Sequence, residues 1–238
     1  MNINGTCITN KKKDMRYTNT LLLRFSNPLS AKEIVSFRGA VNRSISSKDI
    51  LFHNHTVGGG YRYSYPLIQY KRVNGKAAIL CLDAGAQAIG QLISDSDFLF
   101  SINGKKRQFN VECVLSYRDV IQVCDTKFMY SIKGWLPFNE DNYSRYQGLT
   151  DLVGKLFFLE NILKGNILSM GKGIGVFFDS PIECNITQIS DSKITQYKGV
   201  TRTMFDVTFL SNVHIPNYFG VGKGVSVGYG TIMKIDDN

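Results

Sequence analysis

The stretch TLLLRFSNPLSAKEIVSFRGAV, residues 20–41, carries the pattern of a β-strand followed by an α-helix. The apolar residues 20–25 favour the strand. Ser30 and Glu33 then match a capping box, in which each side chain satisfies a free backbone amide at the start of a helix. Apolar residues continue beyond it at helical spacing, at Ile34, Phe37 and Val41. We therefore expect a strand and then a helix of about three to four turns.

The residues that follow extend this pattern to a complete structural unit. Residues 65–73 and 77–82 are strand-like, and Asn74-Gly75 between them is a strong signal for a hairpin turn. One more helix and two extended segments come next, at residues 84–93, 98–102 and 109–115. The order strand, helix, hairpin, helix, strand is that of a ferredoxin-like fold.

A second unit of similar size is expected to begin at Asp125. Its long helix is marked by apolar residues at steps of three and four, which predict one stripe packed on a core. The stripe comprises Leu152, Leu156, Leu159, Leu163, Ile167 and Met170. Strand signals occur at residues 128–136, 182–189, 203–209 and 230–235. No clear helix separates the last two strands. The sequence thus predicts an α+β fold of two tandem ferredoxin-like (RRM-like) domains, residues 1–124 and 125–238, the second less regular than the first.

The net charge of the 238-residue chain is +9, and most of the excess lies in its first half. Residues 1–125 contain 17 Lys and Arg against 9 Asp and Glu. This excess favours a polyanionic partner, although an ordinary basic enzyme would fit it equally well. The apolar runs are too short to cross a bilayer and no apolar signal segment follows Met1, so we expect a cytoplasmic protein. The five scattered cysteines predict neither a disulfide framework nor a structural zinc site.

The segment GVGKGVSVGYG, residues 220–230, has glycines in G-x-G pairs at both ends. Glycine lacks a Cβ and permits positive φ, so the backbone can approach a phosphate closely and direct its amides at it. The segment does not match a Rossmann loop, a P-loop or the RNP1 motif. No helix follows it, Gly224 stands where a P-loop has Ser or Thr, and Val225 and Val227 replace aromatic residues. A flexible hairpin turn is the alternative interpretation. If the segment binds RNA, a side chain at Gly222 should weaken that binding with little effect on the melting temperature.

Two of the three histidines, His53 and His55, lie in the polar stretch FHNH. In an extended segment the period of two places both imidazoles on one side. Two imidazoles can cleave RNA through its own 2′-hydroxyl, because one accepts the hydroxyl proton and the other protonates the leaving 5′ oxygen. Two alternatives remain: a zinc site completed by His214 or a distant carboxylate, and a purely structural pair. Tyrosines and cations from Tyr61 to Arg72 suit single-stranded RNA, but tyrosines are also ordinary strand residues.

The chain resembles the CRISPR-associated repeat endoribonucleases of the RAMP superfamily, in particular their variant from Bacteroidetes-type systems. The family hallmark is G-hydrophobic-G, five residues, G-hydrophobic-G. This chain matches it just before its last strand, at Gly220, Gly222, Gly228 and Gly230. Four further stretches look similar to this variant: SFRGA at 36–40, FHNH at 52–55, YPLIQYK at 65–71 and GNILS at 165–169.

This resemblance implies two tandem ferredoxin-like folds that hold RNA, and metal-independent cutting that leaves a 2′,3′-cyclic phosphate and a 5′-hydroxyl. It implies catalysis by His53 and His55, assisted by Tyr61 and Lys71, without a metal or another cofactor. It also implies RNA binding by the glycine segment, at Gly220, Gly222, Lys223, Gly224, Gly228 and Gly230.

The expected function is therefore that of an endoribonuclease that cleaves precursor CRISPR RNA within its repeats. The alternative is a non-catalytic RNA-binding subunit of a CRISPR effector complex, because some members of the family bind RNA without cutting it. Expected partners are CRISPR repeat RNA and other CRISPR-associated proteins, with no membrane. The expected assembly is a monomer or a homodimer.

Overall fold

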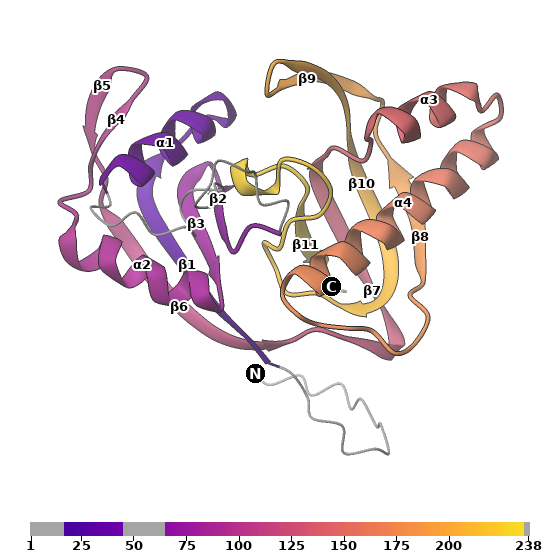
Figure 1. Cartoon of the computed structure of the whole chain (residues 1–238), viewed down its shortest axis with the longest axis horizontal. Helices are drawn as coiled ribbons and strands as arrows, with labels where there is room; N and C mark the ends of the chain where they lie inside the picture. The colour runs from indigo at the N-terminus through magenta and orange to yellow at the C-terminus, as the bar shows by residue number, and fades with distance from the viewer. Residues whose placement is uncertain (1–16, 45–64, 236–238) are drawn as a thin grey trace, which may run out of the picture.

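The computed structural model describes residues 17–44 and 65–235, which form two domains side by side (Figure 1). Each domain contains an antiparallel sheet with helices packed on one face. The chain passes from one domain to the other at Ile121, between two long strands. The predicted α+β class and the tandem ferredoxin-like folds are confirmed.

The first domain follows the predicted order of elements. They are β1 (Tyr17–Pro28), α1 (Ile34–Ser44), β2 (Ile68–Val73), β3 (Lys76–Leu82), α2 (Ala84–Asp95) and β6 (Val111–Val120). The sheet order β2-β3-β1-β6 is that of a ferredoxin-like fold. The hairpin prediction is confirmed, because Asn74 and Gly75 have φ of 49° and 81° and a type I′ turn requires positive φ at both positions.

A short hairpin that the sequence does not predict stands between α2 and β6. Its strands, β4 (Leu99–Ile102) and β5 (Lys105–Gln108), form a separate two-stranded sheet. Asn103 and Gly104 make the turn, with φ of 50° and 79°. The predicted extended segment 98–102 is therefore present, but the fourth strand of the ferredoxin-like sheet is β6.

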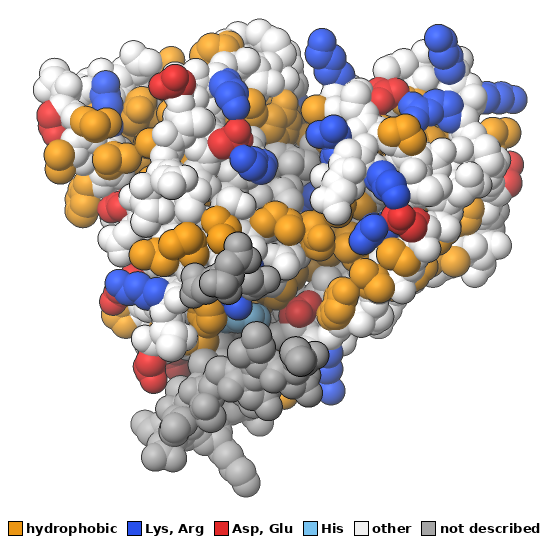
Figure 2. Space-filling model, turned by 180° about the vertical axis from the view of Figure 1, so that it is seen from behind, with side chains coloured by type: hydrophobic (Ala, Val, Ile, Leu, Met, Phe, Trp, Pro, Cys, Tyr) orange, Lys and Arg blue, Asp and Glu red, His pale blue; other side chains and the backbone are white. Residues whose placement is uncertain are grey.

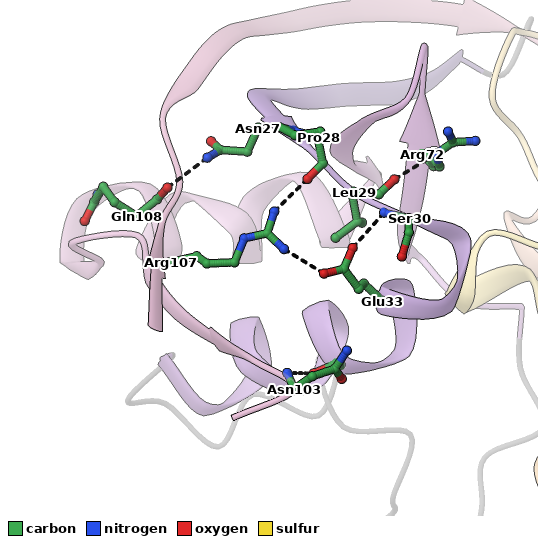
Figure 3. A network of polar contacts seen from close by, with 10 residues as sticks. Asn27, Pro28, Leu29, Ser30, Glu33, Arg72, Asn103, Arg107 and Gln108 are labelled. Atoms are coloured by element: carbon green, nitrogen blue, oxygen red, sulfur yellow. Dashed lines mark hydrogen bonds and ion pairs between the residues drawn. The ribbon is translucent and has the colours of Figure 1, made fainter. Parts of the chain in front are cut away.

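Polar contacts fix this hairpin to the start of α1 (Figure 3). The Ser30 amide donates to the Glu33 carboxylate at 2.8 Å, as the predicted capping box requires, across the 3-10 turn η1 (Ala31–Glu33). The same carboxylate accepts from Arg107 of β5 at 2.7 Å, and a second nitrogen of that guanidinium donates to the Pro28 carbonyl at 2.7 Å. The capping box thus stabilises the helix start and also holds the hairpin in place.

The second domain repeats the same sheet order with different connections. Its elements are β7 (Gln122–Trp135), α3 (Glu140–Gly148), α4 (Leu152–Gly173), β8 (Cys184–Ile189), β9 (Lys193–Tyr197), β10 (Val200–His214), η2 (Val225–Val227) and β11 (Thr231–Ile235). The order β11-β7-β10-β8, read from its other end, matches the first sheet strand for strand, and β9 pairs with the outer part of β10. An irregular segment with only the short turn η2 replaces the second helix, as the sequence predicts.

The apolar stripe of α4 packs on the second sheet. Leu159, Leu163, Ile167 and Met170 are at most 1% exposed. The first two residues of the stripe are not buried: Leu156 is partly exposed, and Leu152, the first residue of the helix, is 69% exposed. No helix of the described chain, α4 included, combines the length and hydrophobicity needed to cross a membrane.

The two domains meet at the open face of the first sheet. Side chains alternate along β1, so that Leu23 belongs to the core of the first domain whereas Leu22 belongs to that of the second. The glycine segment takes part in both cores, since Val221 packs in the second and Val227 in the first. The domain contact therefore holds this segment from two sides.

Candidate nucleic-acid interface

The glycine segment, residues 220–230, occupies the place of a helix between the two domains (Figure 1). Gly220 forms a β-bridge with Thr231, and the Val221 amide donates to the Gly230 carbonyl at 2.9 Å. Its middle, η2, contacts β2 and α1 of the first domain. The segment is therefore a closed loop that touches both domains.

The glycines of this loop are required for its packing. Positive φ, between +63° and +87°, is found at Gly222, Gly224, Gly228 and Gly230. A Cβ on Gly222 would lie 2.9 Å from the Leu136 carbonyl oxygen and 2.9 Å from Trp135 Nε1, closer than real Cβ atoms approach. The expectation that a side chain at Gly222 spares the melting temperature is therefore wrong. RNA binding by the loop stays a prediction beside this folding role.

Replacing Gly222 with alanine should lower the free energy of unfolding by about 2–5 kcal/mol, from about 1–2 kcal/mol of backbone strain and about 1–3 kcal/mol of forced repacking. Gly104→Ala is the matched control, because Gly104 has φ of 79° and nothing within 4 Å of its Cβ position. The control should show only the strain. Denaturant unfolding of both variants measures the difference, and equal losses would mean that space at Gly222 is not limiting.

Two side chains of the first domain anchor the ends of the loop. The Tyr65 hydroxyl donates to the Gly220 carbonyl at 2.8 Å, and Lys71 Nζ donates to Thr231 Oγ1 at 3.1 Å. Lys71 is 0% exposed, and burial lowers its pKa to about 7. Lys71 thus joins β2 to β11 from a buried place, and its catalytic role stays a prediction.

The other predicted catalytic residues, His53, His55 and Tyr61, lie outside the described residues. The segment that contains them connects Ser44, the last residue of α1, with Tyr65. Since the Tyr65 hydroxyl bonds to Gly220, this segment ends beside the glycine loop.

Basic side chains from three elements lie within electrostatic reach of Lys223 or of Tyr197 near the loop, and we call them the basic cluster. It consists of Arg38 of α1, Lys198 and Arg202 of the β9–β10 hairpin, and Lys223 of the loop itself. The pKa of Lys223 is lowered, first by burial and then by Arg202 and Lys198, whereas Glu140 acts in the opposite direction. The protonated form of Lys223 is thus disfavoured by its surroundings. A bound anion would offset the repulsion between Lys223 and the cations Arg202 and Lys198.

Within the cluster, Arg202 has the clearest need for a ligand. Its Nε atom is buried and has no hydrogen-bond partner in the part of the chain that the structure describes. A buried unpaired donor is costly, and a phosphate oxygen would satisfy it. Tyr197 and Tyr229 lie alongside, with ring centroids 5.7 Å apart, and both Arg38 and Arg202 act electrostatically on the Tyr197 hydroxyl. Cations beside aromatic rings can hold the phosphates and bases of single-stranded RNA.

Of the four residues of the basic cluster, the sequence alone predicts only Lys223 as part of an RNA-binding site. Arg38 lies in the stretch SFRGA, which resembles the family, but its charge alone does not mark it as part of a site. A turn signal at Lys198-Gly199, with φ of 52° and 75°, could have located the β9–β10 hairpin. No sequence signal places that hairpin against the glycine loop.

The zinc alternative has no preformed ligand set within residues 17–44 and 65–235, where no three His, Cys, Asp or Glu side chains are grouped to hold a metal. His214, the third histidine, bonds through Nδ1 to the Val120 carbonyl at 2.8 Å. It therefore lies at the junction of the two domains.

Two family models together match almost the whole of the described chain. The model of the Cas6b N-terminal domain matches residues 16–118, and that of the Cas6b C-terminal domain matches residues 122–235. A curated relative, the uncharacterized protein MJ0978 of Methanocaldococcus jannaschii, is 38% identical over 106 residues, which are 44% of this chain and 71% of the relative.

Solved structures share the fold. A crystal structure of Cas6b, 23% identical, covers 92% of this chain and 100% of its own, with a TM-score of 0.82. A second, of the CRISPR RNA processing endoribonuclease Cas6b, is 22% identical with the same coverage and a TM-score of 0.70. At these identities the similarity supports the tandem ferredoxin-like architecture.

Proposed function

This chain belongs to the Cas6b family, and on that basis we propose that it is an endoribonuclease that processes precursor CRISPR RNA by cutting within the repeats. The observation that carries the proposal is the basic cluster beside the glycine loop, where the Arg202 Nε lacks a partner among the described residues and Lys223 lies within electrostatic reach of two other cations. The segment with the two histidines ends beside the same loop, at Tyr65. We propose that the cations that hold the RNA and the histidines that cut it serve one site.

The cleavage uses the RNA's own 2′-hydroxyl as the nucleophile and needs no metal ion. One imidazole of the pair His53 and His55 accepts the hydroxyl proton while the 2′ oxygen bonds to phosphorus. The other imidazole protonates the 5′ oxygen as its bond to phosphorus breaks. The products are a 2′,3′-cyclic phosphate and a 5′-hydroxyl. Tyr61 assists this chemistry, and Lys71 positions the loop from its buried place.

RNA is held by the basic cluster, whose side chains meet phosphates, and by Tyr197 and Tyr229, on which bases stack. The glycine loop contributes a backbone that sits between the two domains. Its glycines are needed for packing. In the complex the amides of Gly222 and Gly224 stand close to the bound strand, whereas those of Gly228 and Gly230 already donate to the carbonyls of Val225 and Gly134.

Incubation of the purified protein with its labelled repeat RNA in EDTA tests the proposal. We expect a single cut, and a 5′ fragment whose terminal phosphate resists phosphatase until acid opens the cyclic ester. The non-catalytic RNA-binding subunit would retard the RNA on a gel and never shorten it. Cutting that requires added Mg²⁺ would contradict the proposed mechanism.

A further inference from the structure

Lys71 is the only lysine or arginine among the described residues whose side chain is fully buried. Basic side chains on the reverse side of the molecule, by contrast, stand at its surface (Figure 2). Lys71 lies on β2 at the contact of the two domains, where its Nζ donates to Thr231 Oγ1 at 3.1 Å. A buried ammonium is costly unless acceptors or a negative charge surround it. The neighbours of Lys71 therefore decide whether it carries a charge.

The groups that face Lys71 are uncharged. Gln69 lies two residues earlier on the same side of β2, and Ala78 lies opposite on β3. Gly220 of the glycine loop approaches both Gln69 and Lys71, and its carbonyl accepts from the Tyr65 hydroxyl at 2.8 Å. Tyr65 can titrate, but burial raises its pKa, so it stays neutral over the range in which a lysine titrates.

The charged and titratable residues of the surrounding elements have partners elsewhere. They are Arg24 of β1 and Lys76 of β3 with Glu112 of β6, Arg72 of β2 with the Leu29 carbonyl, Lys133 of β7 with Asp206, Lys223 of the loop with Glu140, Tyr229 of the loop with Thr195, and Lys234 of β11 with the Phe128 ring. Burial is the only cause that lowers the pKa of Lys71, and no carboxylate of the described chain acts on it. Lys71 thus has no counter-charge among the described residues.

Gln69 supplies an unused acceptor beside Lys71. It is 0% exposed, and its Oε1 has no hydrogen-bond partner among the described residues, while its amide nitrogen donates to the Pro66 carbonyl at 3.0 Å. A Cβ on Gly220 would lie 3.1 Å from Gln69 Oε1 and 3.1 Å from Lys71 Nζ, so the two atoms flank one point of the loop. An ammonium has three donors, and Thr231 accepts one of them. Gln69 Oε1 is placed to accept a second.

The contact of Lys71 lies where the two ends of the glycine loop meet. Thr231 Oγ1, which accepts from Lys71, itself donates to the Gly228 carbonyl at 3.0 Å. Gly220, at the other end of the loop, forms a β-bridge with Thr231. The protonation state of Lys71 therefore acts on both ends of the loop through a single hydrogen-bonded residue.

We propose that Lys71 is a pH-sensitive switch for closure of the glycine loop: the neutral amine permits the loop to close on β2, and the ammonium favours an open loop, in which the lysine reaches water. Gln69 Oε1 accepts from the ammonium while the loop is closed and so limits the cost of the charge. This switch is a property of the free protein and does not depend on the proposed function.

The sign of the pH dependence follows from the two states of the loop. In the closed loop the pKa of Lys71 is about 7, and in an open loop it returns toward the ordinary value of 10.5, so opening takes up one proton between these values. The opening equilibrium constant should rise about tenfold for each unit by which the pH falls from about 10 to about 7. Below that range both states are protonated, and the constant should level off.

Hydrogen exchange of the loop, measured by mass spectrometry on peptides that cover residues 218–231, tests the proposal. The amides of Val221, Lys223 and Gly230 are hydrogen-bonded, so their exchange, corrected for the intrinsic rate at each pH, reports the opening constant. From about pH 9 to about pH 7 this constant should rise about a hundredfold in the wild type and stay unchanged in Lys71→Met, which cannot titrate. Lys76→Met is the matched control: Lys76 lies on the same hairpin with its side chain 38% exposed, and this variant should behave as the wild type does.

Gln69→Leu tests the acceptor with Lys71 still in place. Without Gln69 Oε1 the ammonium is harder to hold in the closed loop, so the opening constant should continue to rise below pH 7. Relative to its own value at about pH 9, opening at about pH 6 should be about tenfold greater than in the wild type. The proposal is overturned if wild-type opening is independent of pH, if Lys71→Met keeps the slope, or if Gln69→Leu levels off where the wild type does. It is also overturned if the loop exchanges only through the global unfolding that denaturant measures, since the loop would then not open by itself.

Discussion

Replacing both histidines, as His53→Ala/His55→Ala, is expected to nearly abolish cleavage of repeat RNA while binding survives. General acid–base catalysis by one side chain typically contributes about 10²–10⁴-fold, so each single variant should slow cutting by about that factor. The double variant should lose less than the product of the two, because the imidazoles act on one reaction as a unit. Single-turnover cleavage with saturating protein measures the rate, and a gel shift measures binding.

Two controls test the nucleophile and the need for a metal ion separately. A repeat RNA with one 2′-deoxy nucleotide at the cut should bind and remain uncut by the wild type, because the nucleophile is missing. EDTA should leave the wild-type rate unchanged. A double-alanine variant that cuts at the normal rate would exclude the histidine pair as the catalytic groups. Loss of binding together with cutting would instead place the histidines in RNA recognition.

The first domain could be predicted because its signals are local. The capping box of Ser30 and Glu33 and the turn at Asn74-Gly75 depend on residues close in sequence, and both are present. The β4–β5 hairpin has the same kind of turn signal, at Asn103-Gly104, but only its first strand has an apolar pattern. Its second strand, Lys105–Gln108, contains no apolar residue, so it has no alternation to recognise, and it is held by the ion pair of Arg107 with Glu33.

The site could be predicted only in part. The glycine loop can be recognised in the sequence because positive φ favours glycine at several of its positions. The sequence cannot show, however, that Trp135 and Leu136 fill the space around Gly222. The sequence predicts Lys71 to be a functional cation, yet its amino group donates to Thr231 at the contact of the two domains. Charge in a sequence does not reveal burial, and burial decides whether a lysine meets a substrate.

Removing two charges of the basic cluster, as Arg202→Gln/Lys223→Gln, should weaken binding of repeat RNA by about tenfold to a hundredfold, since each cation makes charge-assisted contacts with phosphate. Wild-type affinity should itself fall by about tenfold to a thousandfold from low to physiological salt. In the variant the slope of log affinity against log salt should be shallower by about 0.7 for each lost contact with a single strand. Fluorescence anisotropy over a salt series measures both quantities.

Lys105→Gln/Lys106→Gln is the matched control for this loss of charge. It removes the same net charge from the β4–β5 hairpin, which stands at the far end of the first domain from the glycine loop (Figure 1). If affinity depended only on the net charge of +9, the two double variants would bind equally well. A specific site predicts a large loss in the first and little change in the second. Equal losses would contradict the basic cluster as the place where RNA is held, because the Arg202 Nε, unpaired among the described residues, would then contribute nothing that a distant lysine does not.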